Sequence, residues 1–297
     1  MTKNDYKNQW LRLMGEPAYE GYERQVEQVR TFEVDEFRGQ IYRQANGPTT
    51  NQTVLMMLPL DLHDKTPAVV VPFYYPDKVA GYDLGTLEPL EQQANAIGLF
   101  LVQRGYIVIT AEAYHLTEVE QDRGPNDFGR WQVAGEALLQ ANPNWTGVGK
   151  LHADTQLLID MLEADPRVDS DRIGIVGHSL GGKMAMYTGF LDERVRGVVA
   201  SDFGLAWEDS NWSQIWYWGE RLEALQKAGI DHQTLLKAGG LKPFGILAGE
   251  FDDASAEAIL LEAGYQEGQY YFVNHATGHR PPREVLEVAF DWMETWL

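Results

Sequence analysis

Residues 172 to 186, "RIGIVGHSLGGKMAM", contain two overlapping motifs with different chemistry. The G-x-S-x-G segment around Ser179 is typical of the sharp turn that presents a nucleophilic serine. The same residues up to Lys183 match most of G-x-x-x-x-G-K, the loop that wraps a nucleotide phosphate. A phosphate loop needs Ser or Thr after its lysine to hold Mg²⁺, and Met184 offers only a thioether. The sequence therefore favours a serine nucleophile over nucleotide binding.

A nucleophilic serine needs a base and an acid, which follow it in the chain order Ser, Asp or Glu, His. Gly177 and Gly181 would relieve the crowding of the turn around Ser179. Downstream, the strand-like "FGILAGEFDD" ends at a pair of carboxylates that begins with Asp252. His279 lies in the loop "NHATGHRPP", after the last strand-like stretch. The chain thus contains candidates for all three groups in the expected order.

Apolar stretches alternate with helical patterns over most of the chain. "AVVVPFYY", "YIVITAEAY", "RIGIVGHS", "VRGVVASDF", "PFGILAGEFD" and "QYYFVNH" are typical of buried strands. "TFEVDEFRGQIYRQ" and "TVLMMLPL" precede them as antiparallel strands, and helical spacings fill the intervening segments. Repeated β–α units of this kind predict an α/β fold, with one mostly parallel sheet of about eight strands and helices on both faces.

We expect residues 1–297 to form one domain. Residues 1 to about 30 are predicted to form a helical extension. Residues 114–149 and 203–241 are long connections, which usually belong to functional surfaces or carry small helices. The alternative is that these insertions merely cover the edges of the sheet.

The stretch "VDSDRIGIVGHSLGGKMAMYTGFLDERVRGVVASDFG" resembles the α/β-hydrolase superfamily, specifically the dienelactone-hydrolase-like and acetyl-xylan-esterase-like bacterial serine esterases. The upstream "GKLHADTQLLIDMLEADPRVD" is similar to the helix before the elbow in those enzymes. The resemblance extends over roughly residues 30 to 297 and implies an eight-stranded α/β-hydrolase fold. Dienelactone hydrolases use a cysteine nucleophile, and this chain has no cysteine, so that activity is not expected.

The resemblance also bears on the catalytic acid. The family pattern places an aspartate three residues after the strand-end glycine, and from Gly249 this spacing gives Asp252. Asp253 remains an alternative, and so does Asp202, because some lipases carry the acid after the preceding strand. Excess carboxylates could instead cap the following helices.

An oxyanion hole is expected to use the backbone N–H of Leu180 and a donor from "VVVPFYYPDK", either the N–H of Tyr74 or a tyrosine hydroxyl. That loop departs from the familiar His-Gly of the family. Tyr75, Trp212 and Trp216 are candidates for substrate binding, the two tryptophans as a sugar-stacking or apolar wall. The alternatives are packing beneath the site, a buried helix stripe, or a homo-oligomer interface.

Three further residues near the motifs have other interpretations. His275 is a rival base, and the spacing "HATGH" suggests zinc, but ligation at i,i+4 needs a helix and Gly278 favours a loop. His178 is expected to be packed, and Lys183 to be a surface or salt-bridge residue. We therefore expect neither a metal nor a cofactor.

Composition excludes several classes of partner. The formal net charge of −20 disfavours nucleic acids and anionic membranes, which would repel the chain. The longest apolar run, "PAVVVPFYY", is too short to cross a bilayer, and the first residues lack a signal-peptide core. We expect a soluble, cytoplasmic protein that acts on a small-molecule ester.

Together these features predict a serine esterase that acts through an acyl-enzyme. Ser179 would attack the carbonyl, with His279 as base and Asp252 as acid. Short acyl groups, including those on acetylated carbohydrates, fit the resemblance. A serine peptidase or amidase with the same three residues is the alternative enzyme, and a non-catalytic binding protein of the same fold is the alternative from another class.

Overall fold

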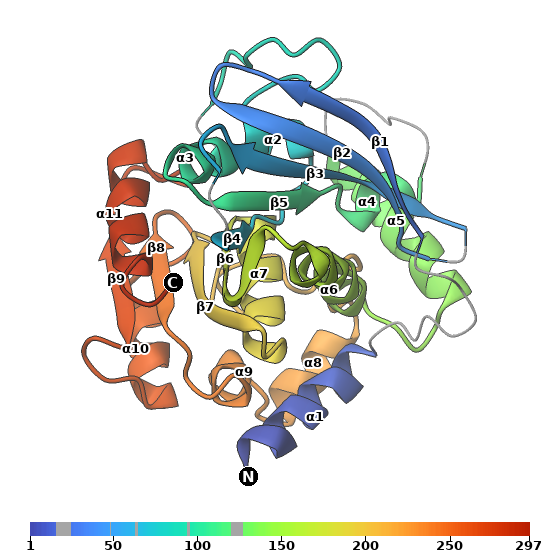
Figure 1. Cartoon of the computed structure of the whole chain (residues 1–297). Helices are drawn as coiled ribbons and strands as arrows, with labels where there is room; N and C mark the ends of the chain where they lie inside the picture. Colours follow the sequence, from blue (N-terminus) through green and yellow to red (C-terminus); the bar gives the residue numbers. More distant parts are fainter. Residues whose placement is uncertain (16–24, 48, 63–64, 94–95, 120–126) are drawn as a thin grey trace.

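A twisted nine-stranded sheet runs through the molecule in the order β1-β2-β3-β5-β4-β6-β7-β8-β9 (Figure 1). The structure, a computed structural model, describes residues 1–15, 25–47, 49–62, 65–93, 96–119 and 127–297. The strands are β1 (Val26–Glu33), β2 (Phe37–Ala45), β3 (Asn51–Pro59), β4 (Thr66–Val70), β5 (Ile107–Ala111), β6 (Val168–His178), β7 (Val195–Ser201), β8 (Phe244–Ala248) and β9 (Tyr270–Asn274). The neighbouring strands β5, β4, β6, β7, β8 and β9 pair in parallel. The pairs β1–β2, β2–β3 and β3–β5 are antiparallel. The predicted α/β fold with a mostly parallel sheet is confirmed.

The described sheet has nine strands where eight were predicted, because "TFEVDEFRGQIYRQ" belongs to two strands and not to one. The chain reverses between β1 and β2, where the N–H of Val34 donates to the carbonyl of Phe37. Phe32 pairs with Gly39 across this hairpin. A Cβ on Gly39 would lie 2.2 Å from the ring of Phe32, so the glycine makes room for the aromatic side chain.

Helices cover both faces of the sheet, as predicted (Figure 1). They are α1 (Lys3–Met14), α2 (Pro76–Ala80), α3 (Ile97–Gln103), α4 (Tyr114–Thr117), α5 (Asp127–Ala141), α6 (Gly147–Ala164), α7 (Leu180–Leu191), α8 (Arg221–Lys227), α9 (His232–Ala238), α10 (Ala254–Ala263) and α11 (Arg283–Met293). Alternate strand residues face opposite ways, so Val70 joins the core beneath α6 and α7, whereas Val69 joins the core beneath α3 and α11.

The N-terminal helix is part of the main core. Trp10 on α1 is fully buried, and its Nε1 donates to the hydroxyl of Thr234 at 3.1 Å. Its ring lies edge-on to Tyr187, with the ring centroids 5.8 Å apart. The predicted extension to about residue 30 is too long, because β1 already begins at Val26. Residues 16–24 of that extension lie outside the described residues.

Both long connections contain helices. The first holds α4 and α5, and its residues 120–126 lie outside the described part. The second holds α8 and α9. Within the described chain, no helix is both long and apolar enough to cross a membrane.

The carboxyl ends of four neighbouring strands meet at one edge of the sheet. In the parallel register, His178 at the end of β6 lies beside Ser201, which ends β7. Ser201 lies beside Leu247 of β8, and the last pair of β8 and β9 joins Ala248 to Asn274. Because parallel strands end together, the loops after β6, β7, β8 and β9 converge at this edge, where open α/β sheets usually bind ligands.

Candidate active site

Ser179 lies in a strained turn between β6 and α7. Its backbone has φ 56° and ψ −118°, which is rare for a residue with a side chain. The N–H of Ser179 donates to the carbonyl of Ser201, and its own carbonyl accepts from the N–H of Lys183. The turn is therefore fixed on the strand side and on the helix side, and we call it the elbow.

Two glycines permit the elbow. A Cβ on Gly177 would lie 2.0 Å from the carbonyl oxygen of Gly181. A Cβ on Gly181 would lie 2.1 Å from the carbonyl oxygen of Pro72, in the loop after β4. Both contacts are with backbone atoms, so a side chain could fit only if the backbone moved.

Replacing Gly181 with alanine should push the Pro72 loop away from the elbow. We expect ester hydrolysis to fall by at least about 100-fold, because small misplacements of reacting groups have effects of that size. Gly129→Ala is the matched control, because no atom lies within 4 Å of the Cβ it would add. Rates and thermal melts of the two variants check this prediction. A Gly181→Ala variant as active as Gly129→Ala would contradict it.

His279 is paired with Asp202, and not with Asp252 as predicted. The distance from His279 Nδ1 to Asp202 Oδ2 is 2.7 Å, and the Asp202 side chain is fully buried. Burial alone would raise the pKa of Asp202, but hydrogen bonds from His279 and from backbone amides of the loop after β8 lower it to about 2. An ionised carboxylate only accepts hydrogen bonds, so Nδ1 of His279 carries the proton of this bond.

Asp252 is instead held by the loop after β7. Its carboxylate accepts from the backbone N–H groups of Phe203, Gly204 and Leu205, at 2.6 to 3.0 Å. The group is fully buried, and burial raises its pKa to about 6 against the effect of these hydrogen bonds. The other candidate, Asp253, caps α10 through the N–H of Ser255.

The two aspartates form a reciprocal arrangement, which we call the carboxylate clasp. Asp202 Oδ1 accepts from the four backbone N–H groups of residues 249–252, at 2.8 to 3.1 Å. Asp252 in turn accepts from three N–H groups directly after Asp202. Asp202 also has a positive φ of 42°. Each loop therefore binds the carboxylate of the other, and the clasp turns Asp202 toward His279.

The other histidines near the elbow are placed differently. His178 is buried against His279, with ring centroids 4.6 Å apart, and burial lowers its pKa to about 3. It is therefore a neutral, packed residue, as expected. The side-chain hydrogen bond of His275 is local, because its Nδ1 contacts the hydroxyl of Thr277 at 2.7 Å.

A cavity of about 280 Å³ opens beside the elbow. We call it the elbow cavity. It is lined by Tyr74, Phe128, Ser179, Leu180, Lys183, Asp202, Phe203, Ser210, Asn211, Tyr217, Phe251 and His279. The structure therefore brings Ser179 and His279 together with both residues suggested for the oxyanion hole, Leu180 and Tyr74. The ring of Tyr74 is stacked on Trp131, with the centroids 4.4 Å apart.

The predicted substrate-binding residues lie elsewhere. Trp212 is fully buried, and its Nε1 donates to the carbonyl of Gly204 at 2.8 Å. Trp216 is also buried, and Tyr75, which precedes α2, does not line the elbow cavity. The two tryptophans thus pack in the core, the alternative left open by the sequence. The aromatic lining comes instead from Tyr74, Phe128, Phe203, Tyr217 and Phe251.

Lys183 was expected on the surface, but it is 4% exposed and lines the elbow cavity. Its Nζ donates to Ser210 Oγ at 2.5 Å and to Asn211 Oδ1 at 3.2 Å. Burial lowers the pKa of Lys183 to about 7, and Asp252 opposes this shift. Helical spacing could have revealed this position, because residues i and i+4 share one face and Lys183 follows Ser179 by four.

The buried ammonium should reduce stability in a pH-dependent way. Because the folded pKa lies below the unfolded value of 10.5, the cost is complete below pH 7 and declines as pH rises through 7 toward 10.5. Lys183→Met should therefore raise Tm by at least about 2 °C more at pH 6 than at pH 9. Thermal melts at the two pH values test this, since lost hydrogen bonds would affect both alike. An equal change at both would contradict it.

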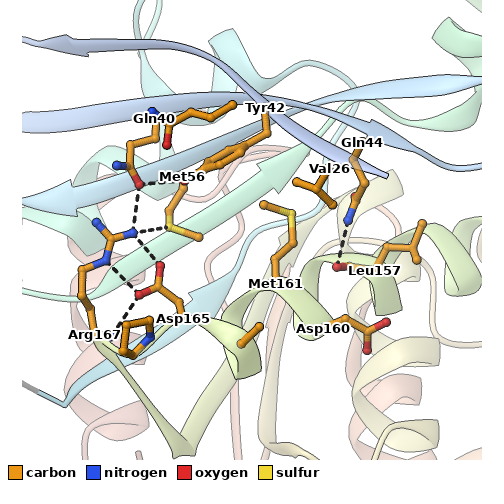
Figure 2. A pocket seen from close by; sticks show the side chains of 13 residues that line it. Val26, Gln40, Tyr42, Gln44, Met56, Leu157, Asp160, Met161, Asp165 and Arg167 are labelled. Atoms are coloured by element: carbon orange, nitrogen blue, oxygen red, sulfur yellow. Dashed lines mark hydrogen bonds and ion pairs between the residues drawn. The ribbon is translucent and has the colours of Figure 1, made fainter. Parts of the chain in front are cut away.

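A larger hollow of about 620 Å³ lies between the β1–β2 hairpin and α6 (Figure 2). Its polar side chains mainly bond to neighbouring protein groups: Arg167 contacts Asp165 and Gln40, and Gln44 donates to the carbonyl of Leu157. None of its described lining residues is a serine, a histidine or a lysine. The smaller elbow cavity is therefore the better candidate for chemistry. Within the described residues, no group of three or more His, Asp or Glu side chains could hold a metal ion.

Known proteins share this fold. A Bacteroides fragilis protein described as an acetyl xylan esterase superposes on this chain with a TM-score of 0.74 at 14% identity, over 99% of this chain and 87% of that chain. A glucuronoyl esterase of Solibacter usitatus superposes with a TM-score of 0.66 at 13% identity, over 99% of this chain and 91% of that chain. YtaP of Bacillus subtilis is 27% identical over 162 residues, which are 48% of this chain and 50% of that relative. The chain thus matches about half the length of this curated relative.

The sequence pattern of the dienelactone hydrolase family matches residues 62–210. This region includes the loop after β4, the elbow with Ser179, and Asp202. It accounts for half of the chain and contains the strands that position the nucleophile. The chain therefore belongs to the dienelactone hydrolase family.

Proposed function

We propose that this protein is a serine esterase that hydrolyses carboxylic esters of carbohydrates. The observation that carries the proposal is the His279–Asp202 pair, which shares the elbow cavity with a serine in a strained turn. Family membership supports hydrolysis. The fold shared with acetyl xylan and glucuronoyl esterases supports ester substrates that contain a carbohydrate.

In the proposed mechanism, Oγ of Ser179 attacks the ester carbonyl while Nε2 of His279 takes its proton. Asp202 holds the imidazole in the correct tautomer and stabilises its positive charge. The C–O bond to the alcohol then breaks, and His279 returns the proton to the departing oxygen. Water, activated by the same imidazole, attacks the acyl-enzyme and releases the acid with Ser179 restored.

The developing oxyanion would be stabilised next to the elbow. The N–H of Leu180 begins α7, where the helix dipole favours negative charge. Tyr74 is the candidate for the second donor, because it lines the same cavity and follows the Pro72 loop that contacts the elbow. The loss of one such donor typically costs about 3 kcal/mol of transition-state stabilisation.

Labelling and substrate profiling test the proposal. A fluorophosphonate probe should modify the purified protein at Ser179, and the protein should hydrolyse 4-nitrophenyl acetate and acetylated xylo-oligosaccharides. Aminoacyl anilides serve as the comparison, and faster cleavage of these would indicate an amidase. Protein that is neither labelled nor active on any ester would overturn the proposed function.

A further inference from the structure

Lys183 places an amino group in the wall of the elbow cavity without a carboxylate within salt-bridge distance. Its two hydrogen-bond acceptors, Ser210 Oγ and Asn211 Oδ1, are both neutral. Its Nζ also lies 4.1 Å from the ring centroid of Trp212 and 4.9 Å from that of Tyr217. Among the described residues, no carboxylate lies within salt-bridge distance of this ammonium.

The acidic groups near Lys183 are already engaged. Asp202, which lines the same cavity, binds His279 and the amides of residues 249–252. Asp252 is bound to the amides of residues 203–205. A buried ammonium with only neutral partners is costly, and an anion brought next to it would recover part of that cost.

The ammonium lies at a defined place relative to the nucleophile. Lys183 follows Ser179 by four residues along α7, which corresponds to about 6 Å of helix rise. Both residues line one cavity of about 280 Å³, which is the size of a small ligand rather than of a polymer segment. A molecule whose ester carbonyl lies at Ser179 therefore extends past Lys183 within a few bonds.

We propose that Lys183 binds a carboxylate carried by the substrate itself, so that the preferred esters have a second, ionised carboxyl group close to the ester carbonyl. The inference rests on the proposed function and specifies its substrate class. Lys183 is then a specificity-determining residue. The formal net charge of −20 does not oppose such a substrate, because at physiological salt charges beyond about 8 Å are largely screened.

Two pairs of esters distinguish the sources of such a carboxylate. Monomethyl glutarate and methyl pentanoate differ by a carboxylate on the acyl side, and acetylated galacturonic acid and acetylated galactose differ by one on the alcohol side. In at least one pair, kcat/KM should be at least about tenfold higher for the charged member. Lys183→Met should abolish that preference, so that kcat/KM for the charged member no longer exceeds that for the neutral member.

The matched control is Lys227→Met, which removes a 74% exposed lysine and should keep the preference. A preference that survives in Lys183→Met, or a preference for the neutral member in both pairs, would overturn the inference. Calorimetric titration of Ser179→Ala with glutarate and with galacturonate decides the matter even without turnover. Binding must weaken at least about tenfold when Lys183→Met is added; otherwise the inference fails, whatever the outcome for the esterase activity.

Discussion

Ser179→Ala should reduce the hydrolysis of 4-nitrophenyl acetate by about 10⁶-fold, the scale on which loss of the serine nucleophile acts in a serine protease. The reason is that Ser179 is the serine in the strained turn of the elbow, so the variant lacks the proposed nucleophile. The variant should fold normally, because alanine can occupy the turn about as well as serine does. Initial rates and a thermal melt measure the two effects separately.

Ser170→Ala is the control for this experiment, because Ser170 is an exposed residue on the same strand, β6. Its rate should equal that of the unmodified protein. If Ser179→Ala retains more than about 1% of the activity, the nucleophile must be another group or an activated water. The proposed mechanism would then be wrong even if the substrate class were correct.

Asp202→Asn should lower kcat by about 10⁴-fold, the scale on which the same exchange acts in a serine protease. Asparagine would hold His279 through the wrong tautomer, so Nε2 could no longer accept the proton of Ser179. Asp252→Asn should reduce kcat less than about tenfold but should lower Tm, because its carboxylate binds backbone amides rather than the imidazole. Rates across pH 5 to 9 and thermal melts of both variants give the comparison.

Asp253→Asn serves as the control, since that exposed side chain caps α10 and should affect neither rate nor mechanism. A loss of kcat in Asp252→Asn as large as in Asp202→Asn would transfer the role of the acid to Asp252. Partial activity in Asp202→Asn with an unchanged pH profile would equally contradict the assignment.

The fold and the family could be predicted because they depend on local patterns. Apolar runs bounded by turn residues predicted the parallel strands, and G-x-S-x-G around Ser179 predicted the strand–turn–helix unit that the structure contains. The strained φ of Ser179 and the close approach of Gly177 to the carbonyl of Gly181 both follow from that motif. The prediction of the α/β fold and of the family could therefore rest on features a few residues long.

The partner of His279 could not be predicted in the same way. Asp202 directly follows β7, and Asp252 lies in the loop after the neighbouring strand β8, so a carboxylate near a strand end does not by itself identify the partner. The choice is made by side-chain direction, which depends on the positive φ of Asp202 and on amides contributed by a loop 50 residues later. Such information is tertiary and leaves no local trace in the sequence.

The tryptophan-rich segment misled the prediction for a related reason. Trp212 and Trp216 are close in sequence to Ser210 and Asn211, which do line the elbow cavity. In an irregular segment without a fixed period, neighbouring side chains can point in opposite directions. The tryptophans pack in the core, and the small polar residues line the elbow cavity.

The carboxylate clasp has a consequence for motion near the elbow. The backbone amides of residues 203–205 and 249–252 are held by two carboxylates, each of which belongs to the opposite loop. Neither loop can open without breaking the bonds that hold the other, so the two must fluctuate as a single cooperative unit. The imidazole rests on that unit through Asp202. Opening of either loop would therefore break the hydrogen bond between Asp202 and His279. The lifetime of the closed clasp then sets an upper limit on how long the imidazole stays oriented toward Ser179.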